Sequence, residues 1–333
     1  MSNILCTIGP ISQNYSNLKK ILNHSNFVRL NGAHNTIDWH KKTSNLIKKI
    51  NPNCKILIDL PGIKPRTANL EIIKIKKNQS VKFYFAKKNL NKKKNSLNIP
   101  LTKPLPKFGK IKNFTVADGR YNFEYISHGK NFILGKSIHE VNLLPKKGLN
   151  IPGSVYSDIL QEKIYLNFLK KISKLQIDAI GLSYVQNSKI IKRIKKKTNK
   201  IIVSKVENSL GCSNAKEISE NSDIIMIDRG DLSAEIGENN LYKETINISK
   251  FAKKNGKLLI MATENLESMI YNSAPSKSEI ISLSFSKSLN ADYLMLSDET
   301  ATAKKFLSIL KWFKNFNEIE HKDNNFKKKQ ISK

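Results

Sequence analysis

Eight short apolar runs, each ending in polar residues, recur along the chain and constrain its fold more than any other feature. In order they span residues 4–9, 27–31, 56–59, 179–184, 201–205, 224–228, 258–263 and 293–297. Short β-branched runs of this kind predict buried strands. Most are separated by segments of helical periodicity, and a strand followed by a helix, repeated eight times, is typical of a closed (β/α)₈ TIM barrel of the α/β class.

The segments between the runs carry the pattern of amphipathic helices. Apolar residues recur at four-residue steps from Leu160 to Ile172. Another periodic segment, which contains Leu18, follows Ser12, and we expect Ser12 to cap that helix. A last amphipathic segment begins at Phe306 and would close the barrel.

The alternation breaks once, after the third run. Between about residues 68 and 147 the chain carries short period-two stretches, at 81–85 and 121–126, punctuated by prolines and by Asp118-Gly119. This pattern predicts a small β domain inserted in a βα loop, where it would stand over the catalytic face as a lid. We therefore expect a discontinuous barrel domain at 1–67 and 148–320, a lid domain at 68–147, and a basic tail at 321–333 that frays.

Two neighbouring apolar runs end in charge, within the stretches 201–208 and 223–232. A buried strand does not easily hold Lys205, Glu207 and Asp231 unless these groups meet each other, an ion or a substrate. The carboxyl ends of parallel strands are where ligands bind in α/β sheets and barrels. Two carboxylates and an ammonium at that place indicate a metal beside a cationic group, a site suited to phosphate or to an enolate.

The formal net charge of +31 invites the interpretation that the chain binds nucleic acid. We favour a solvated basic surface, because lysine is spread over the whole chain and the clusters at 92–94, 195–197 and 327–329 lack interleaved aromatic residues. Nucleic acid is therefore not an expected partner, although anionic small substrates would still be attracted.

Other features concern the compartment. The longest apolar runs fall well short of the roughly 18 residues that cross a bilayer, so we expect no membrane contact. The first residues lack the basic and apolar regions of a secretory signal. Cys6, Cys54 and Cys212 have no metal-ligand spacing and leave one thiol unpaired, which fits a reducing compartment. We expect a cytoplasmic protein with free thiols.

Nine stretches along the chain carry a resemblance to a known family. They are C-T-I-G-P at 6–10, V-R-L-N-G-A-H at 28–34, I-D-L-P-G-I-K-P-R-T at 58–67, V-A-D-G at 116–119, K-K-G-L-N-I-P-G at 146–153, S-K-V-E-N at 204–208, R-G-D-L at 229–232, A-T-E-N-L-E-S-M at 262–269 and M-L-S-D-E-T-A at 295–301. In this order they resemble pyruvate kinase. A collinear set over nearly the whole chain is far more specific than any one motif. The resemblance implies a TIM barrel with an inserted small β-barrel lid domain after the third strand.

The resemblance also implies a reaction, the transfer of a phosphoryl group from phosphoenolpyruvate to ADP, which gives ATP and, after protonation of the enolate, pyruvate. Glu207 and Asp231 would hold the divalent ion, Mg²⁺ or Mn²⁺, because hard oxygen ligands suit these ions. Lys205 would neutralise charge on the transferring phosphoryl group and on the enolate oxygen.

The substrate contacts follow from the same resemblance. Arg29 resembles the phosphate-binding arginine of the family, and its planar fork suits phosphate better than lysine would. Gly230 would let the backbone approach the substrate carboxylate, and Thr263 would lie near the enolate carbon in a protonation relay. We therefore expect Lys205, Thr263 and Arg29 to be catalytic, and Arg29, Gly230, Asp231 and Thr263 to bind substrate.

A further set, Asn31, His34, Arg66 and Lys147, matches positions that contact nucleotide in the family. Plainer interpretations exist for single members of these sets. Arg66 and Lys147 could be ordinary surface charges, Lys205 with Glu207 could be a structural ion pair, and Asp118-Gly119 could be a hairpin turn.

The monovalent-cation site of the family is altered here. The family commonly uses Asn, Ser, Asp and Thr oxygens, whereas this chain keeps Asn31 and Asp59 but has Ala33 and Leu60 at the two hydroxyl positions. Lys64 replaces a glutamate, and members with lysine there resemble a branch that dispenses with K⁺. Because an ammonium can replace the charge of the missing cation, we expect K⁺ not to be required, with Lys64 as an internal substitute.

Further departures bear on regulation and on competing functions. The resemblance does not include the C-terminal domain that binds allosteric effectors and helps build the tetramer, so we expect no feedback control of that kind and leave a homo-oligomer open. One alternative is a catalytically silent relative with a regulatory or binding role, suggested by the altered cation site. Another is a Mg²⁺-enolate barrel such as a lyase or aldolase, which would not need a nucleotide lid.

Overall fold

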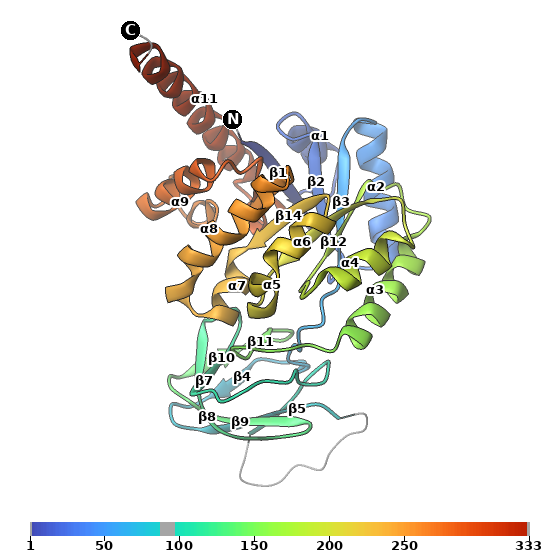
Figure 1. The fold of residues 1–333 in the computed structure, drawn as a ribbon, viewed down its shortest axis with the longest axis vertical. Coiled ribbons are helices and arrows are strands. Elements are labelled where there is room, and N and C mark those ends of the chain that lie inside the picture. The colour runs from blue at the N-terminus through green and yellow to red at the C-terminus, as the bar shows by residue number, and fades with distance from the viewer. Residues whose placement is uncertain (1, 87–96, 332–333) are drawn as a thin grey trace.

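The centre of the molecule is a closed barrel of eight parallel strands (Figure 1). The computed structural model describes residues 2–86 and 97–331, with side chains as far as residue 318. The barrel strands are β1 (Asn3–Ile8), β2 (Phe27–Asn31), β3 (Lys55–Leu60), β12 (Ala179–Leu182), β13 (Ile201–Val206), β14 (Ile224–Asp228), β15 (Leu258–Ala262) and β16 (Tyr293–Leu296). Each overlaps one of the eight predicted runs, so the predicted (β/α)₈ fold is confirmed.

Alternate residues of each strand point into the barrel, and this parity places the charged residues. Val203 of β13 and Met226 of β14 belong to the buried apolar cluster that fills the interior. The next inward position toward the carboxyl end is polar or charged on five strands, where it holds Thr7, Arg29, Asp59, Lys205 and Asp228. The apolar interior therefore ends in a layer of charge at one mouth of the barrel.

Helices surround the barrel and bury their apolar faces against the outward-facing strand residues. They are α1 (Tyr15–Leu22), α2 (Ile37–Ile50), α3 (Asp158–Ile172), α4 (Ser188–Lys195), α5 (Ser209–Ser213), α6 (Ala215–Asn221), α7 (Arg229–Ile236), α8 (Glu238–Lys254), α9 (Lys277–Ser288), α10 (Asp298–Ala301) and α11 (Phe306–Ile331), with the 3₁₀ turn η1 (Glu267–Ile270). Side chains fix several of their starts. Ser276, for example, forms a reciprocal capping box with Glu279 at the start of α9.

The ends of the first and last helices differ from our expectations. Ser12 does not cap α1, because Asn14 does so by accepting a hydrogen bond from Asn17 N at 2.9 Å. Ser12 instead accepts from Gly9 N at 2.9 Å and braces the loop after β1. The region from residue 321, which we expected to fray, continues the backbone of α11 to Ile331. Extending an existing helix orders one residue for each hydrogen bond gained, which is far less costly than starting one.

Three aspartates recur at the amino-terminal end of the barrel. Asp178, Asp223 and Asp292 each precede a strand, and each accepts a hydrogen bond from the backbone of a neighbouring strand at 2.6 to 2.8 Å. Each also pairs with a lysine on a surrounding helix. These groups close the end of the barrel opposite to the charged layer and tie helices to strands.

The segment between β3 and α3 builds a separate β structure, below the barrel in Figure 1. Its strands are β4 (Ile73–Ile75), β5 (Ser80–Tyr84), β6 (Leu97–Pro100), β7 (Asn113–Val116), β8 (Tyr121–Gly129), β9 (Phe132–Ser137), β10 (Val141–Leu143) and β11 (Leu149–Asn150). They form a six-stranded sheet, β11-β7-β8-β9-β5-β6, and a two-stranded sheet, β10-β4. Phe83, Phe114 and Phe123 meet at its centre, with ring centroids 5.2 to 5.8 Å apart.

The tip of one hairpin in this insertion reaches the mouth of the barrel. Ala117, Asp118 and Gly119 all have positive φ and form the tight turn between β7 and β8. Asp118 pairs with Lys64 at 2.9 Å, so this turn also carries an interdomain contact. Asn150 adds a second link by donating to Glu235 in α7 at 3.3 Å. The insertion therefore lies at the end of the barrel that holds the charged layer.

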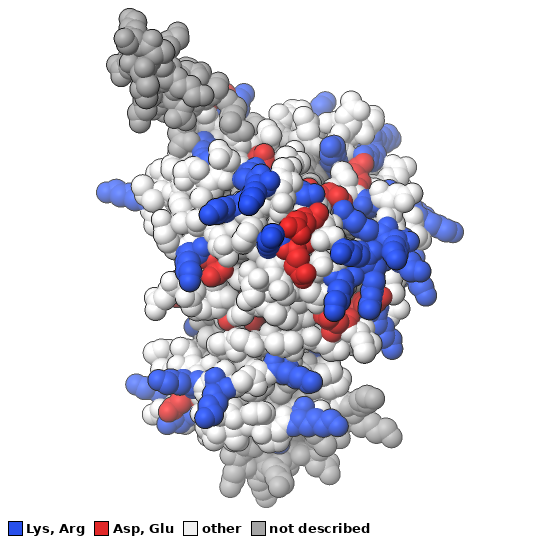
Figure 2. Space-filling model, viewed as in Figure 1, with Lys and Arg blue, Asp and Glu red and all other residues white. Residues whose placement is uncertain are grey.

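The surface of the molecule is strongly basic. Figure 2 shows Lys and Arg side chains over much of the visible face, most densely near α3 and α4. Cys6, Cys54 and Cys212 are all buried as free thiols, as expected. Within the described part of the chain, every helix is too short or too polar to cross a bilayer.

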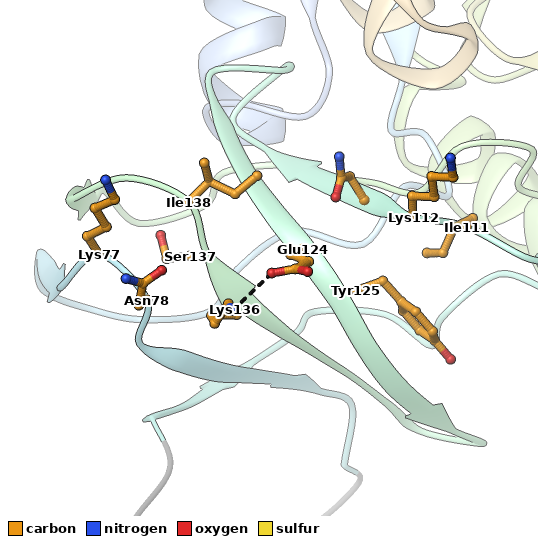
Figure 3. Close-up of a pocket in the computed structure, with 10 residues that line it drawn as sticks. Lys77, Asn78, Ile111, Lys112, Glu124, Tyr125, Lys136, Ser137 and Ile138 are labelled. Carbon is orange, nitrogen blue, oxygen red and sulfur yellow. Dashed lines mark ion pairs between the residues drawn. The ribbon is translucent and has the colours of Figure 1, made fainter.

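A groove of about 640 Å³ lies on the insertion, beside strands β8 and β9 (Figure 3). Lys77, Lys112 and Lys136 line it, and Lys136 is paired with Glu124 at 3.1 Å. Its lining residues all come from the insertion, between Lys77 and Ile138, whereas the charged layer belongs to the barrel. We therefore place the candidate site by its chemistry, at the barrel mouth, and not in this groove.

Candidate active site

Arg29 and Asp59 form a buried pair at the mouth of the barrel. Arg29 faces into the barrel from β2 and donates from Nε and Nη2 to Asp59 Oδ2, at 3.0 and 2.8 Å. Its Nη1 donates to Thr7 Oγ1 at 3.3 Å. Asp59 also lies 3.3 Å from Lys205 Nζ, so one carboxylate holds two cationic groups beside each other. Such a pair of cations is suited to binding an anionic substrate.

Lys205 occupies the centre of the charged layer. Its Nζ lies 2.7 Å from Glu207 and 3.4 Å from Asp228, in addition to the contact with Asp59. The Lys205 side chain is almost fully buried, and the carboxylates raise the pKa of its ammonium although burial opposes them. The ammonium therefore stays charged at neutral pH.

Glu207 is fully buried just beyond the end of β13. Its Oε2 accepts a hydrogen bond from Tyr184 N at 2.6 Å, and its Oε1 faces Lys205. Burial raises the pKa of Glu207 to about 8, although the Lys205 ammonium lowers it. A carboxyl group with such a pKa gives up its proton readily only when a further positive charge arrives.

Asp231 lies in the first turn of α7, where helix dipoles favour negative charge. Its Oδ1 accepts from the Tyr184 hydroxyl at 2.9 Å and pairs with Lys64 at 2.5 Å. Burial would raise the pKa of Asp231, but the Lys64 ammonium holds it well below its usual range. Both of these contacts use Oδ1.

The oxygens of Glu207, Asp228 and Asp231 lie within 4.8 Å of one another. Two ligands on opposite sides of one Mg²⁺ ion are about 4.2 Å apart and adjacent ligands are closer, so these oxygens need only small side-chain shifts to share an ion. Three hard carboxylate ligands at this spacing fit Mg²⁺ or Mn²⁺ well. The barrel mouth can therefore hold one divalent ion beside the Lys205 ammonium.

Thr263 follows β15 and stands opposite the first turn of α7. Its Oγ1 accepts from Gly230 N at 2.9 Å and lies 3.3 Å from Asp228 Oδ1. Thr263 and Glu264 both have positive φ, at 62° and 54°, which is uncommon for residues with side chains. The surrounding structure must hold this strained turn in place.

Arg229 supplies much of that support. Its guanidinium is buried and donates to the carbonyl of Thr263, to Asn265 Oδ1 at 2.8 Å and to Ser282 Oγ at 2.5 Å. Burial lowers the pKa of Arg229, although the charges of Glu264 and Asp228 oppose this shift. Arg229 thus fixes the Thr263 turn through neutral acceptors.

The residues expected to contact nucleotide come from the end of β2, the segments after β2 and β3, and the segment before β11. Asn31 ends β2 and accepts from Ala33 N at 3.1 Å, while His34 lies in the following loop with only part of its side chain exposed. Partial burial and then the charges of Arg66, Arg29 and Lys146 lower the pKa of His34, so several cations converge there. Arg66 donates to Lys146 O at 3.1 Å, and Lys147 N donates to Thr67 Oγ1 at 3.1 Å.

Lys64 does not meet the residues with which we grouped it. It is buried as an internal cation, but its ion-pair partners in the structure are Asp118 and Asp231. Asp59 pairs with Arg29 and Lys205 instead. The sequence could not reveal these partners, because the pairs depend on how the insertion and α7 meet.

Three residues of the site carried no role in our sequence interpretation. Asp228 and Arg229 adjoin Asp231, and Tyr184 reaches the same carboxylate from the loop after β12. Parity would have found Asp228, because it lies two residues beyond the inward-facing Met226 of β14. Tyr184 and Arg229 offered no comparable signal.

The sequence of the chain is similar to a known family model and to curated proteins. A sequence model described as pyruvate kinase, barrel domain, matches residues 1–306. A curated pyruvate kinase of Thermoplasma acidophilum is 30% identical over 309 residues, 90% of this chain and 55% of the relative. Those of Methanocaldococcus jannaschii and of Buchnera aphidicola subsp. Schizaphis graminum are 29% and 31% identical over 315 and 324 residues. They cover 92% and 90% of this chain, which spans 67% and 66% of their own lengths.

Proposed function

This chain belongs to the pyruvate kinase family, and we propose that it transfers the phosphoryl group of phosphoenolpyruvate to ADP, giving ATP and pyruvate. Because the chain spans a little over half to two thirds of the length of the relatives above, this activity is an inference about the barrel and its insertion. The observation that carries it is the convergence of Lys205 with Glu207 and Asp231 at one barrel mouth. Phosphoryl transfer needs this combination of cationic groups more than it needs covalent chemistry.

Glu207 and Asp231 would hold Mg²⁺ or Mn²⁺. When bound, such an ion supplies charge neutralisation to the phosphate and carboxylate oxygens of the substrate. The buried Glu207 carboxyl suits this role, because its raised pKa reflects a place where negative charge lacks compensation. Asp231 would present Oδ2, while Lys64 and Tyr184 hold Oδ1.

Lys205 and Arg29 would bind the transferring phosphoryl group. Both are buried, both contact Asp59, and their charges point to the same mouth. Arg29 offers a planar guanidinium, and Lys205 a compact ammonium that can also stabilise the enolate oxygen. Asp59 would keep the two cations side by side before substrate arrives.

The substrate carboxylate would lie at the amino terminus of α7, beside Gly230. Backbone N–H groups and the helix dipole favour an anion there. Gly230 N now donates to Thr263 Oγ1, so Thr263 shares this position with the carboxylate. From there the Thr263 hydroxyl would take part in protonating the enolate carbon, in the turn that Arg229 supports.

Asn31, His34, Arg66 and Lys147 would contact the nucleotide, at the side where cations gather around His34. We take 1–67 and 148–320 as the catalytic domain, with 68–147 as a lid whose Asp118 already touches the barrel through Lys64. The protein would act in the cytoplasm, a location that its free thiols suit.

We also propose that the reaction does not require K⁺. Lys64 supports this view, because it is a buried permanent charge near the proposed ion site. Its contacts differ from those we expected, so it would act on Asp231 and on the lid rather than beside Asp59.

A coupled assay of pyruvate formation from phosphoenolpyruvate and ADP tests this proposal. We expect turnover that requires Mg²⁺ or Mn²⁺ and that is equal with Na⁺ or K⁺ as the monovalent ion. A second candidate function, a catalytically silent binding protein, is favoured by one observation, the ion pair that Lys64 makes with Asp231. Binding of phosphoenolpyruvate without turnover under all ion conditions would support that candidate instead.

A further inference from the structure

Asp228 ends β14 beside the two carboxylates proposed to hold the divalent ion. We propose that Asp228 is a third carboxylate ligand of that ion, so that the protein binds a divalent ion before any substrate is present. The inference rests on the proposed function and adds a residue to its metal site. Three observations support it: the direction of the Asp228 side chain, the spacing of the three carboxylate oxygens, and the weak contacts that the protein gives the buried Asp228 carboxylate.

The direction follows from the strand. Ile224 and Met226 of β14 point into the barrel, so Asp228 points into it at the carboxyl end. This is the same inward position that Lys205 occupies on the adjacent strand β13. Asp228 therefore faces the space enclosed by the barrel mouth and not the surrounding helices.

The spacing permits one ion to touch all three groups. Each residue of the set Glu207, Asp228 and Asp231 offers an oxygen within 4.8 Å of the other two. Oxygens on opposite sides of one Mg²⁺ ion are about 4.2 Å apart, so small shifts of the side chains suffice to bring all three groups onto one ion. β14, α7 and the segment after β13 bring these residues together.

The contacts of Asp228 within the protein are weak. The residue is 6% exposed, yet its oxygens reach Thr263 Oγ1 at 3.3 Å and Lys205 Nζ at 3.4 Å, both at the long limit of such contacts. Glu207 Oε1 also lacks a well-aligned hydrogen bond among the described residues, although it lies 2.7 Å from Lys205. Buried carboxylates are costly unless strongly paired. The weak contacts of Asp228 and of Glu207 Oε1 therefore indicate a cation that the protein itself does not supply.

The local charges lead to the same conclusion. The layer at the barrel mouth contains four carboxylates, Asp59, Glu207, Asp228 and Asp231, but three cations, Arg29, Lys64 and Lys205. Lys205 alone lies near three of the carboxylates. A divalent ion would add two positive charges to this group of residues, which an anionic substrate could then meet.

The test measures binding of Mn²⁺ to the full chain without substrate, by the loss of the free-ion signal in electron paramagnetic resonance. Asp228→Asn removes the charge at nearly constant size. Asp223→Asn is the matched control, because Asp223 precedes the same strand at the opposite end and pairs with Lys195. We expect binding to weaken about 10- to 100-fold for Asp228→Asn, the range typical of disturbed metal sites, and less than about twofold for Asp223→Asn.

A second readout separates a ligand from a neighbour that acts through Lys205. Proton relaxation of water reports how many water molecules bind to Mn²⁺, and Asp228→Ala should add about one when a protein ligand is lost. An unchanged water number with weakened binding would overturn direct ligation. Asp228→Glu keeps the charge and should retain most of the affinity for Mn²⁺. This conservative variant shows whether a loss of binding in the other variants comes from misfolding.

The inference and the proposed function can fail separately. If Glu207→Gln weakens Mn²⁺ binding and the folded Asp228→Asn protein binds as the wild type does, the third ligand is refuted and the metal site stands. If Glu207→Gln also binds as the wild type does, the ion lies elsewhere, and both the metal site of the proposed function and this inference are overturned.

Discussion

The ammonium of Lys64 lies 2.5 Å from the carboxylate of Asp231, and this ion pair joins the segment after β3 to the first turn of α7. The same ammonium lies 2.9 Å from Asp118 at the tip of a hairpin in the insertion. One buried cation therefore connects the insertion to a carboxylate proposed to hold a divalent ion. The divalent ion and the Lys64 ammonium would compete for the Asp231 carboxylate. The position of the insertion and the affinity for the ion should therefore depend on each other.

Replacing Lys64 tests this coupling. Lys64→Met should lower the free energy of unfolding by about 3 kcal/mol without divalent ions, because it leaves a largely buried carboxylate unpaired. It should also tighten Mn²⁺ binding by about tenfold, since a competing positive charge is gone. Denaturant titration and ion titration measure the two effects. Lys48→Met, which breaks a pair with Asp178 at the far end of the barrel, should leave Mn²⁺ binding unchanged.

Arg229 should affect turnover without touching substrate. Arg229→Lys keeps the charge but loses the fork that holds the carbonyl of Thr263 and Asn265. We expect kcat to fall by about 100-fold with a small change in KM, because modest displacement of a reacting group costs about that factor. Arg193→Lys, at an exposed pair with Glu162, is the control. Equal kinetics of the two variants would show that the Thr263 turn holds without Arg229.

The stability of the protein should fall as the pH rises toward 8. Burial raises the pKa of Glu235 to about 8, although the Lys64 charge lowers it. Between its ordinary value of about 4.3 and this value, the folded protein keeps a proton that the unfolded chain has lost, so stability decreases with increasing pH. The slope is at most about 1.4 kcal/mol per pH unit for one group.

Glu235→Gln should reduce that slope, because the amide does not titrate. It also preserves an acceptor for Tyr156 and Asn150, which both donate to Glu235 Oε1. Urea titrations at intervals from pH 5 to pH 8 measure the difference between variant and wild type. Parallel curves for the two proteins would mean that Glu235 is ionised in the folded state throughout this range.

Gly32 should tolerate no side chain. A Cβ there would lie 2.1 Å from Asp59 O and 2.8 Å from Phe168 Cζ, so β2 and β3 would have to separate. Gly32→Ala should therefore destabilise the protein by about 2 kcal/mol, a typical cost of overpacking. At Gly109 a Cβ meets nothing within 4 Å, and Gly109→Ala should change stability by less than about 0.5 kcal/mol. Thermal unfolding of both variants provides the comparison.

The sequence predicts the barrel well because each strand carries its own signal. Runs such as 201–205 and 224–228 are apolar, short and β-branched, and their burial on both faces follows from that composition alone. Lys205, Glu207 and Asp231 stand out in the sequence because charge at the end of a buried strand is unusual. These signals are local, so they need no knowledge of the rest of the fold.

The partners of the site residues were not predictable in the same way. Lys64 was matched to Asp59 by position in the chain, whereas the folded molecule brings Asp118 and Asp231 to it from the insertion and from α7. Ser12 has the right residue type for a helix cap, but Asn14 stands nearer the first turn. In both cases the partner depends on the folded chain and not on the residue type.

The central claim is that Lys205 acts on the phosphoryl group at a divalent-ion site formed by Glu207 and Asp231. The most direct measurement is the rate of pyruvate formation by Lys205→Met, compared with its binding of Mn²⁺ and phosphoenolpyruvate. We predict a loss of rate of at least about 1,000-fold with both ligands still bound, since an electrostatic group that acts on the transition state is removed. A Lys205→Met protein that forms pyruvate at the wild-type rate would contradict the account.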